Sequence, residues 1–443
     1  MLRNFIHAGF GGGVSQLISF FSLPLIARIY SPATYATWAI VMATAGILGT
    51  ISCLRYELAI VTSNDEKDAS SILWGCIILS LLVGIVIFTS FFVLSKENLI
   101  YQDSVHLNVF HHSIFISLIA ALISIGSTLQ YWNTRHKLFF HNSIALVVSS
   151  STTAAIQLIW ALEISPTPYG LLLGSACGLL AAILFRLGAI LFTKTIPVLS
   201  WEVVSRILEC MKKNRRFLLY STPYALFGVV RDRATILIME IFLPMQIVGL
   251  YALAYRVMNF PVTLVSNAIR PVFFQACSSQ GVMAIEPQLN RIMKWLVIIA
   301  MPCVVFYLYF AEEMFMLFFG SKWQGAGNIG KILIFPVFTF LLVNWMDRIM
   351  DVLGEQRLTL ILETIFSSLS LLGLLVGFLL GLGFIKSLII QCSILVIYNI
   401  TYLIIAFERA GYDRRKPFKL MPLAFVITVI TTLVIEIFKV DLT

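Results

Sequence analysis

The sequence predicts an all-α polytopic membrane protein with about twelve transmembrane helices and a possible thirteenth. Of its 443 residues, 59% are hydrophobic and 12% are charged, whereas soluble domains carry about 45–50% apolar and about 25% charged residues. The mean hydropathy is +0.93. The apolar residues gather in runs of about 20 or more, the length that a helix needs to cross a bilayer. Lipid is therefore the expected solvent for most of the chain.

Each apolar run is expected to form one spanning helix. The first run has only Arg3 ahead of it and no clear cleavage site, so we expect a first helix rather than a removed signal peptide. The last run ends with Glu436 and Lys439, so it is predicted only as an addition to a core of twelve. The runs lie near residues 5–30, 36–60, 71–95, 110–134, 141–162, 169–193, 217–243, 247–275, 291–319, 328–353, 359–382, 384–407 and 418–438.

The charges of the loops predict the orientation of the chain. With the N-terminus in the cytoplasm, 20 of the 31 Lys and Arg residues fall in cytoplasmic loops and six fall on the opposite side. This bias follows the positive-inside rule. Because the net charge of +9 is spread over short loops, membrane topology explains it better than nucleic-acid binding does. The remaining five basic residues lie within apolar runs: Arg186, Arg231, Arg233, Arg256 and Arg270.

The longest polar stretch between helices, 194–216, follows the sixth run and divides the core into two halves. Both halves begin on the cytoplasmic side, so any internal repeat is parallel. We predict an N-terminal six-helix lobe (1–193), a cytoplasmic linker (194–216), a C-terminal six-helix lobe (217–408), and a basic cytoplasmic segment with the possible extra helix (409–443).

Charged residues within the apolar runs are the main candidates for function, because a charge in the hydrocarbon core usually faces a cavity or a partner. Arg231, Asp232 and Arg233 lie about 20–25 Å along the seventh run, and Arg256 reaches a comparable depth on the eighth. Two interpretations stay open at this point. The residues form an anion-binding cavity, or an Asp–Arg pair holds the two helices together.

The excess of positive charge favours the anion-binding cavity, since Asp232 can neutralise only one arginine. Arg231 and Arg233 are about 200° apart on a regular helix, so both can face one cavity only if the helix is broken. Pro223 and Gly228 would permit such a break. Glu240, seven residues after Arg233, shares its face.

A second polar group ends the tenth run. Asn344, Asp347, Arg348 and Asp351 share one stripe, which is either a solvated helix end or a gate or proton-coupling cluster. Arg270 is grouped with these cavity or coupling candidates.

A third charged pair, Arg55 and Glu57, ends the second run. Its two interpretations are a solvated helix end and a cytoplasmic gate.

No catalytic, metal or cofactor site is predicted. The stretch 325–332 matches a phosphate loop up to Lys331, but Ile332 stands where Ser or Thr would hold magnesium. His106, His111 and His112 gather in one loop, where a solvated loop is a better interpretation than a metal site.

Several stretches resemble the O-antigen flippases, the polysaccharide-transporter branch of the multidrug/oligosaccharidyl-lipid/polysaccharide (MOP) flippase superfamily. They are Leu54–Val61 (Leu-Arg-Tyr-Glu-Leu-Ala-Ile-Val), Asp232-Arg233 with Val248–Tyr251, the Phe-Gly-x-x-Trp-x-x-Ala-Gly pattern from Phe319, and Gly354–Arg357. The resemblance implies two six-helix lobes around a central cavity that opens alternately to each side. It implies transport of an undecaprenyl-diphosphate-linked oligosaccharide from the cytoplasmic to the periplasmic leaflet of the bacterial inner membrane.

Arginine can bind phosphate oxygens in a bidentate fork. We therefore expect Arg231, Arg233 and Arg256 to bind the substrate. Further expected partners are membrane lipids, H⁺ or Na⁺ as coupling ion, and glycan polymerase machinery. The alternatives are an ion-coupled multidrug exporter of the same superfamily and a polyprenyl-linked glycosyltransferase or ligase.

Overall fold

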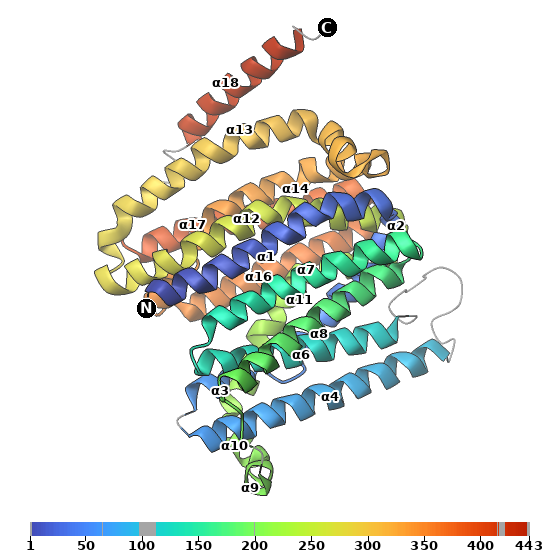
Figure 1. Ribbon diagram of the computed structural model, residues 1–443. Helices are drawn as coiled ribbons and strands as arrows, with labels where there is room; N and C mark the ends of the chain where they lie inside the picture. The colour runs from blue at the N-terminus through green and yellow to red at the C-terminus, as the bar shows by residue number, and fades with distance from the viewer. Residues whose placement is uncertain are drawn as a thin grey trace. The chain divides into compact units, whose positions relative to one another are not determined.

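The computed structural model describes residues 2–63, 65–96, 112–198, 200–413, 415 and 421–440. Helices form almost all of this part of the chain, and it contains no strand (Figure 1). A helix lies at each of the thirteen predicted runs, so the predicted fold class is confirmed. Eleven of these helices are long and apolar enough to cross a membrane. The two outside that set are α11 (Thr222–Phe242), which carries three consecutive charged residues, and α18 (Met421–Val440).

The helices form two compact units, Met1–Ala252 and Leu253–Thr443. The first contains α1 (Leu2–Ile29), α2 (Pro32–Ile51), α3 (Glu57–Thr62), α4 (Glu66–Lys96), α6 (Ser113–Arg135), α7 (Phe139–Glu163), α8 (Pro168–Phe192), α9 (Trp201–Ser205), α10 (Ile207–Lys213) and α11. Within it, α7 packs along α1 and α8, α6 packs against α2, α4 and α8, and α11 packs against α2. The lobe boundary at 194–216 stays a prediction.

The second unit takes up the chain inside α12 (Met245–Gln280), whose first turns belong to the first unit. It continues with α13 (Glu286–Phe319), α14 (Gln324–Val343), α15 (Ile349–Val352), α16 (Gln356–Leu379), α17 (Phe384–Arg409) and α18. Here α14 packs against α13 and α17, α16 packs along α17, and α18 packs against α13.

Small residues allow the closest helix contacts. A Cβ atom at Gly178 of α8 would lie 2.0 Å from the Thr153 hydroxyl oxygen of α7. A Cβ atom at Gly249 of α12 would lie 1.8 Å from the Pro32 carbonyl oxygen at the start of α2. Membrane helices use small residues in this way because lipid supplies little hydrophobic drive for their association.

Two predicted spans are interrupted. The run 36–60 ends as α2 at Ile51, and a turn with Leu54 at φ 51° and Arg55 at φ 58° leads into α3. The run 328–353 ends as α14 at Val343, and a 3₁₀ turn (Asn344–Met346) leads into α15. A continuous helix over either run was a wrong prediction, because neither turn contains a glycine or a proline that would mark the break.

The glycine-rich stretch before Lys331 lies inside α14 and does not form a phosphate loop. The Lys331 Nζ lies 3.1 Å from Glu312 Oε1 of α13. His112 is buried, whereas His106 and His111 lie outside the described residues. The described residues contain no group of three metal-binding side chains.

Candidate functional site

Arg233 lies near the middle of α11, on the surface of that helix that meets α2. Its Nη1 donates a hydrogen bond to the Met42 carbonyl oxygen at 3.1 Å. A Cβ atom at Gly46, one turn further along α2, would lie 3.0 Å from the Arg233 Cζ. The guanidinium therefore lies over a glycine, where a larger residue would push it away. Among the described residues Arg233 forms no ion pair, and its side chain is exposed.

Arg231 is held differently. Its Nε lies 2.9 Å from Oδ1 of the adjacent Asp232. The structure thus pairs Asp232 with Arg231, its neighbour on the same helix. Because α11 is continuous from Thr222 to Phe242, Arg231 and Arg233 leave it about 200° apart. The helical geometry changes only before α11, where Phe217–Ser221 form a π-helical turn.

The other two members of the predicted central group lie on α11 and α12. Glu240 is buried, with 6% of its surface exposed, two turns after Arg233. Arg256 is half-buried and belongs to the second compact unit. The meeting of Arg256 with the α11 arginines stays a prediction.

Arg55 and Glu57 form an ion pair at the interruption after α2. The Arg55 Nη1 lies 3.1 Å from Glu57 Oε1, and the Cys53 thiol donates to Glu57 Oε2 at 2.9 Å. Only 1% of Glu57 is exposed. A carboxylate this buried is not a solvated helix end, and the role of Arg55 and Glu57 as a cytoplasmic gate stays a prediction.

Arg135 joins the neighbouring elements. From the end of α6 its Nη1 donates to the carbonyl oxygens of Ile60 and Ser63, and its Nε lies 3.2 Å from Glu66 Oε2. It thereby satisfies carbonyls at the end of α3 that have no partner within the helix.

In the second unit, Arg270 links α12 to the turn after α14. Its Nη2 donates to the backbone oxygen and the side-chain oxygen of Asn344, at 2.7 and 2.8 Å. Its Nε lies 3.2 Å from Asp347 Oδ1. The Asn344 amide in turn donates to Ser266 at 2.9 Å. The structure therefore brings Arg270 of α12 together with Asn344 and Asp347 of the predicted stripe, and their role in coupling stays a prediction.

The remainder of the predicted stripe is separate. Arg348 Nη1 lies 2.9 Å from Asp351 Oδ2, and both side chains are at least one-third exposed. This second pair fits a solvated helix end.

Two polar side chains within spans were given no role from the sequence. Arg186 of α8 is 5% exposed, and its only hydrogen bond among the described residues goes to Gln130 Oε1 at 3.4 Å. Glu363 of α16 accepts a hydrogen bond from the Tyr398 hydroxyl of α17. Both residues can be noticed in the sequence as charges within apolar runs. Their uncharged partners cannot be predicted from helical spacing, because they lie 56 and 35 residues away in the chain.

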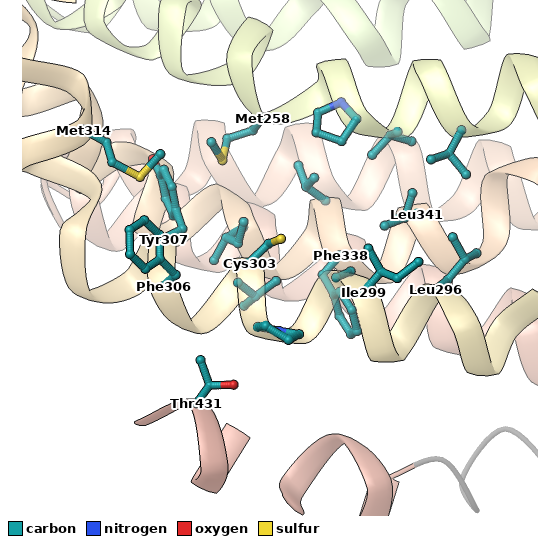
Figure 2. A pocket seen from close by; sticks show the side chains of 18 of the residues that line it. Met258, Leu296, Ile299, Cys303, Phe306, Tyr307, Met314, Phe338, Leu341 and Thr431 are labelled. Atoms are coloured by element: carbon teal, nitrogen blue, oxygen red, sulfur yellow. The ribbon is translucent and has the colours of Figure 1, made fainter. Parts of the chain in front are cut away.

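An apolar cavity of about 900 Å³ opens in the second unit (Figure 2). Its walls come from α12, α13, α14 and α18, and Thr431 marks the α18 side. It suits a hydrocarbon chain, because nearly all of its lining side chains are aliphatic or aromatic. Representative lining residues are Met258, Ile299, Cys303, Phe306, Phe338 and Leu341.

Comparison with known proteins identifies relatives of the sequence and of the fold. The model of the family described as "Polysaccharide biosynthesis protein" matches residues 25–327. No protein with curated annotation matches the sequence.

Solved structures share the fold at low sequence identity. A lipid II flippase MurJ in an inward closed conformation matches with a TM-score of 0.70 and 15% identity over 99% of both chains. An inward-facing multidrug resistance MATE family transporter of the MOP superfamily matches with a TM-score of 0.57 and 15% identity, over 92% of this chain and 94% of its own. A MOP superfamily transporter from Pyrococcus furiosus, whose binding pocket is described as having reverse polarity, matches with a TM-score of 0.56 and 15% identity, over 92% and 96%.

Proposed function

Because the chain belongs to the polysaccharide biosynthesis protein family, we propose that it is a flippase for an undecaprenyl-diphosphate-linked oligosaccharide of the O-antigen repeat-unit type. It carries this cargo from the cytoplasmic to the periplasmic leaflet of a bacterial inner membrane by alternating access. It acts as a transporter rather than an enzyme, with its N-terminus in the cytoplasm. The fold that it shares with a lipid II flippase supports a lipid-linked cargo.

The observation that carries the proposal is Arg233. It is a cation near the middle of a helix, held over Gly46 by a backbone carbonyl, with no acidic partner among the described residues. Placing an unpaired charge in the hydrocarbon core of a membrane is costly, so a protein that keeps one in a span usually uses it for a ligand or a pathway. A diphosphate supplies the matching negative charge, and the planar guanidinium can bind it through two hydrogen bonds.

Arg256 and Arg231, the other two basic candidates, have different roles in this proposal. Arg256 shares the diphosphate with Arg233. Arg231, which is already paired with Asp232, acts mainly by fixing the local charge.

The hydrocarbon of the cargo needs no polar site. It can remain in the bilayer, and the apolar cavity of about 900 Å³ in the second unit offers it a further apolar surface.

Coupling to H⁺ or Na⁺ is assigned to the cluster of Arg270, Asn344 and Asp347. The Asp347 carboxylate and the Arg270 guanidinium are within ion-pair distance, yet Asp347 Oδ1 and Arg270 Nε are buried without a hydrogen-bond partner of good geometry. A loosely matched charge pair of this kind is a reasonable place for an ion to exchange. Glu240 is a second buried carboxylate available for coupling.

An ion-coupled multidrug exporter is the second candidate, because MATE transporters share the fold. A cavity for cationic drugs would favour acidic residues, whereas the unpaired charge on α11 is basic. A glycosyltransferase or ligase is less well supported, and sugar turnover by the purified protein would reveal one.

The test is complementation. The gene is placed in strains that lack their own flippase and make different glycans, and surface glycan is measured. Restoration in at least one strain is expected. Drug resistance without glycan restoration in any strain would instead favour the exporter.

A further inference from the structure

The segment between α8 and α11 is anchored to the start of α4 (Figure 1). Val203 and Cys210 are buried there, and the Val203 carbonyl accepts a hydrogen bond from Ser71 at 2.8 Å. Lys67 Nζ lies 2.8 Å from Glu202 Oε2, and Lys213 Nζ lies 3.5 Å from Asp68 Oδ2. One face of α9 and α10 is therefore fixed against α4.

The opposite face carries an apolar stripe. Trp201 is 85% exposed, Val204 is 37% exposed and Leu208 is 71% exposed. Trp201 and Val204 are three residues apart in α9, and Leu208 follows in α10, which ends two residues before Arg215. We call Trp201, Val204 and Leu208 the linker stripe.

The linker stripe lies on helices that pack beside the lipid-facing surface of α4. α9 and α10 pack beside the first turns of α4, from Lys67 to Gly75. The following turns of the same helix expose Ile78, Leu82 and Ile85, side chains that face lipid in a spanning helix. Ser71, Gly75, Ile78 and Leu82 are spaced by four, three and four residues, so α9 and α10 pack on the same stripe of α4 that exposes lipid-facing side chains one turn further on.

The charged residues around the linker stripe indicate what kind of surface it binds. Between residues 200 and 216 the chain has five basic residues and two acidic ones. The acidic Glu202 is already engaged by Lys67, whose ammonium group lowers the pKa of that carboxyl. Lys212, Arg215 and Arg216 are exposed. An exposed tryptophan beside basic residues is typical of a segment at the membrane–water interface.

From these observations we propose that α9 and α10 form an interfacial binding site for anionic phospholipids. The linker stripe inserts among the lipids beside α4, and Lys212 and Arg215 bind their phosphate groups. Bound lipid at this site holds the connection between α8 and α11 against the membrane. The surface offers its charge to lipid rather than to a protein, because α9 and α10 lie on the stripe of α4 that faces lipid one turn further on.

Lipid insertion is tested by fluorescence of the full chain in vesicles of phosphatidylglycerol with brominated acyl chains. The contribution of Trp201 is the difference between the native protein and Trp201→Phe. Bromine at a shallow acyl position should quench this contribution, and aqueous iodide should not. Quenching by iodide with no effect of bromine would show a water-exposed surface, as a protein partner would require, and would overturn the proposal.

Lipid charge is tested by native mass spectrometry of protein released from mixed phosphatidylglycerol and phosphatidylcholine. The variant Lys212→Gln with Arg215→Gln should lose the preference for phosphatidylglycerol roughly thirtyfold, as expected for two interfacial cations. The matched control, Lys322→Gln with Lys386→Gln, removes the same charge elsewhere and should keep the preference. An equal loss in both variants would show a general charge effect and would contradict a site at Lys212 and Arg215.

Discussion

Arg231 and Arg233 are separated by one residue, yet they have different partners. Arg231 is paired with the adjacent Asp232, whereas Arg233 is held by a carbonyl oxygen of α2. The sequence identified both arginines, because a charge in an apolar run is conspicuous. It could not identify the partner of Asp232, because that depends on the side-chain rotamers of neighbouring residues. It also gave no indication of Gly46, whose importance comes only from the packing of α11 on α2.

Gly46 should therefore control transport through Arg233. In Gly46→Ala the new methyl group would lie 3.0 Å from the Arg233 Cζ and displace the guanidinium. We expect a loss of transport of at least severalfold with near-normal abundance in the membrane. Gly228→Ala is the matched control on α11, because no atom lies within 4 Å of its added methyl group. Full transport by Gly46→Ala would show that the position of the Arg233 guanidinium is unimportant.

Variants of Arg270 and Asp347 should distinguish a structural role of this pair from a role in ion coupling. Asp347→Asn leaves the Arg270 charge without its carboxylate, so abundance and transport should both fall; because both side chains are about one-third exposed, solvent lessens the loss of stability. Asp347→Asn combined with Arg270→Gln should recover abundance. Transport should stay low if Asp347 carries the coupling ion. Recovery of transport in the double variant would leave this cluster with a purely structural role.

At the scale of helices, hydrophobic length predicted where spans lie but not where they break. The thirteen runs each contain a helix because an apolar stretch in lipid must satisfy its own backbone hydrogen bonds. The break after α2 was missed because Leu54 and Arg55 adopt positive φ without a glycine or proline to mark the turn. The link from Arg270 to Asn344 was only partly predictable, since the two residues are 74 positions apart.

Gly249 should be required for the packing of α12 against the start of α2. A Cβ atom there would lie 1.8 Å from the Pro32 carbonyl oxygen, which is backbone and cannot rotate away. Gly249→Ala should destabilise the fold by about 1–3 kcal/mol, the usual effect of overpacking. The measurement is the melting temperature of the purified protein in detergent, with Gly228→Ala as the control. An unchanged melting temperature would contradict this close contact.

At the scale of the whole molecule, composition was enough to predict a multi-pass membrane protein, and the relatives share that architecture. The loop charges add an orientation that is a separate prediction. Reporter fusions after Asp65, Arg135, Arg206 and Arg414 should report cytoplasm, and fusions after Asp103, Pro166 and Lys322 should report periplasm. Among these sites, Asp103 and Arg414 lie outside the described residues. A reversal at any interior loop would mean that a span has been missed or added.

The central claim is that an arginine within the membrane binds the diphosphate of a lipid-linked glycan. The most direct test is translocation of a fluorescently labelled undecaprenyl diphosphate oligosaccharide in vesicles that contain the purified protein, scored by reduction of the label in the outer leaflet. The native protein should translocate this substrate. Arg233→Ala should slow it about tenfold to a hundredfold, the effect of one charged hydrogen-bonded contact of roughly 1.5–3 kcal/mol, and Arg233→Lys should be intermediate. Native rates in Arg233→Ala, with protein correctly inserted, would contradict the claim.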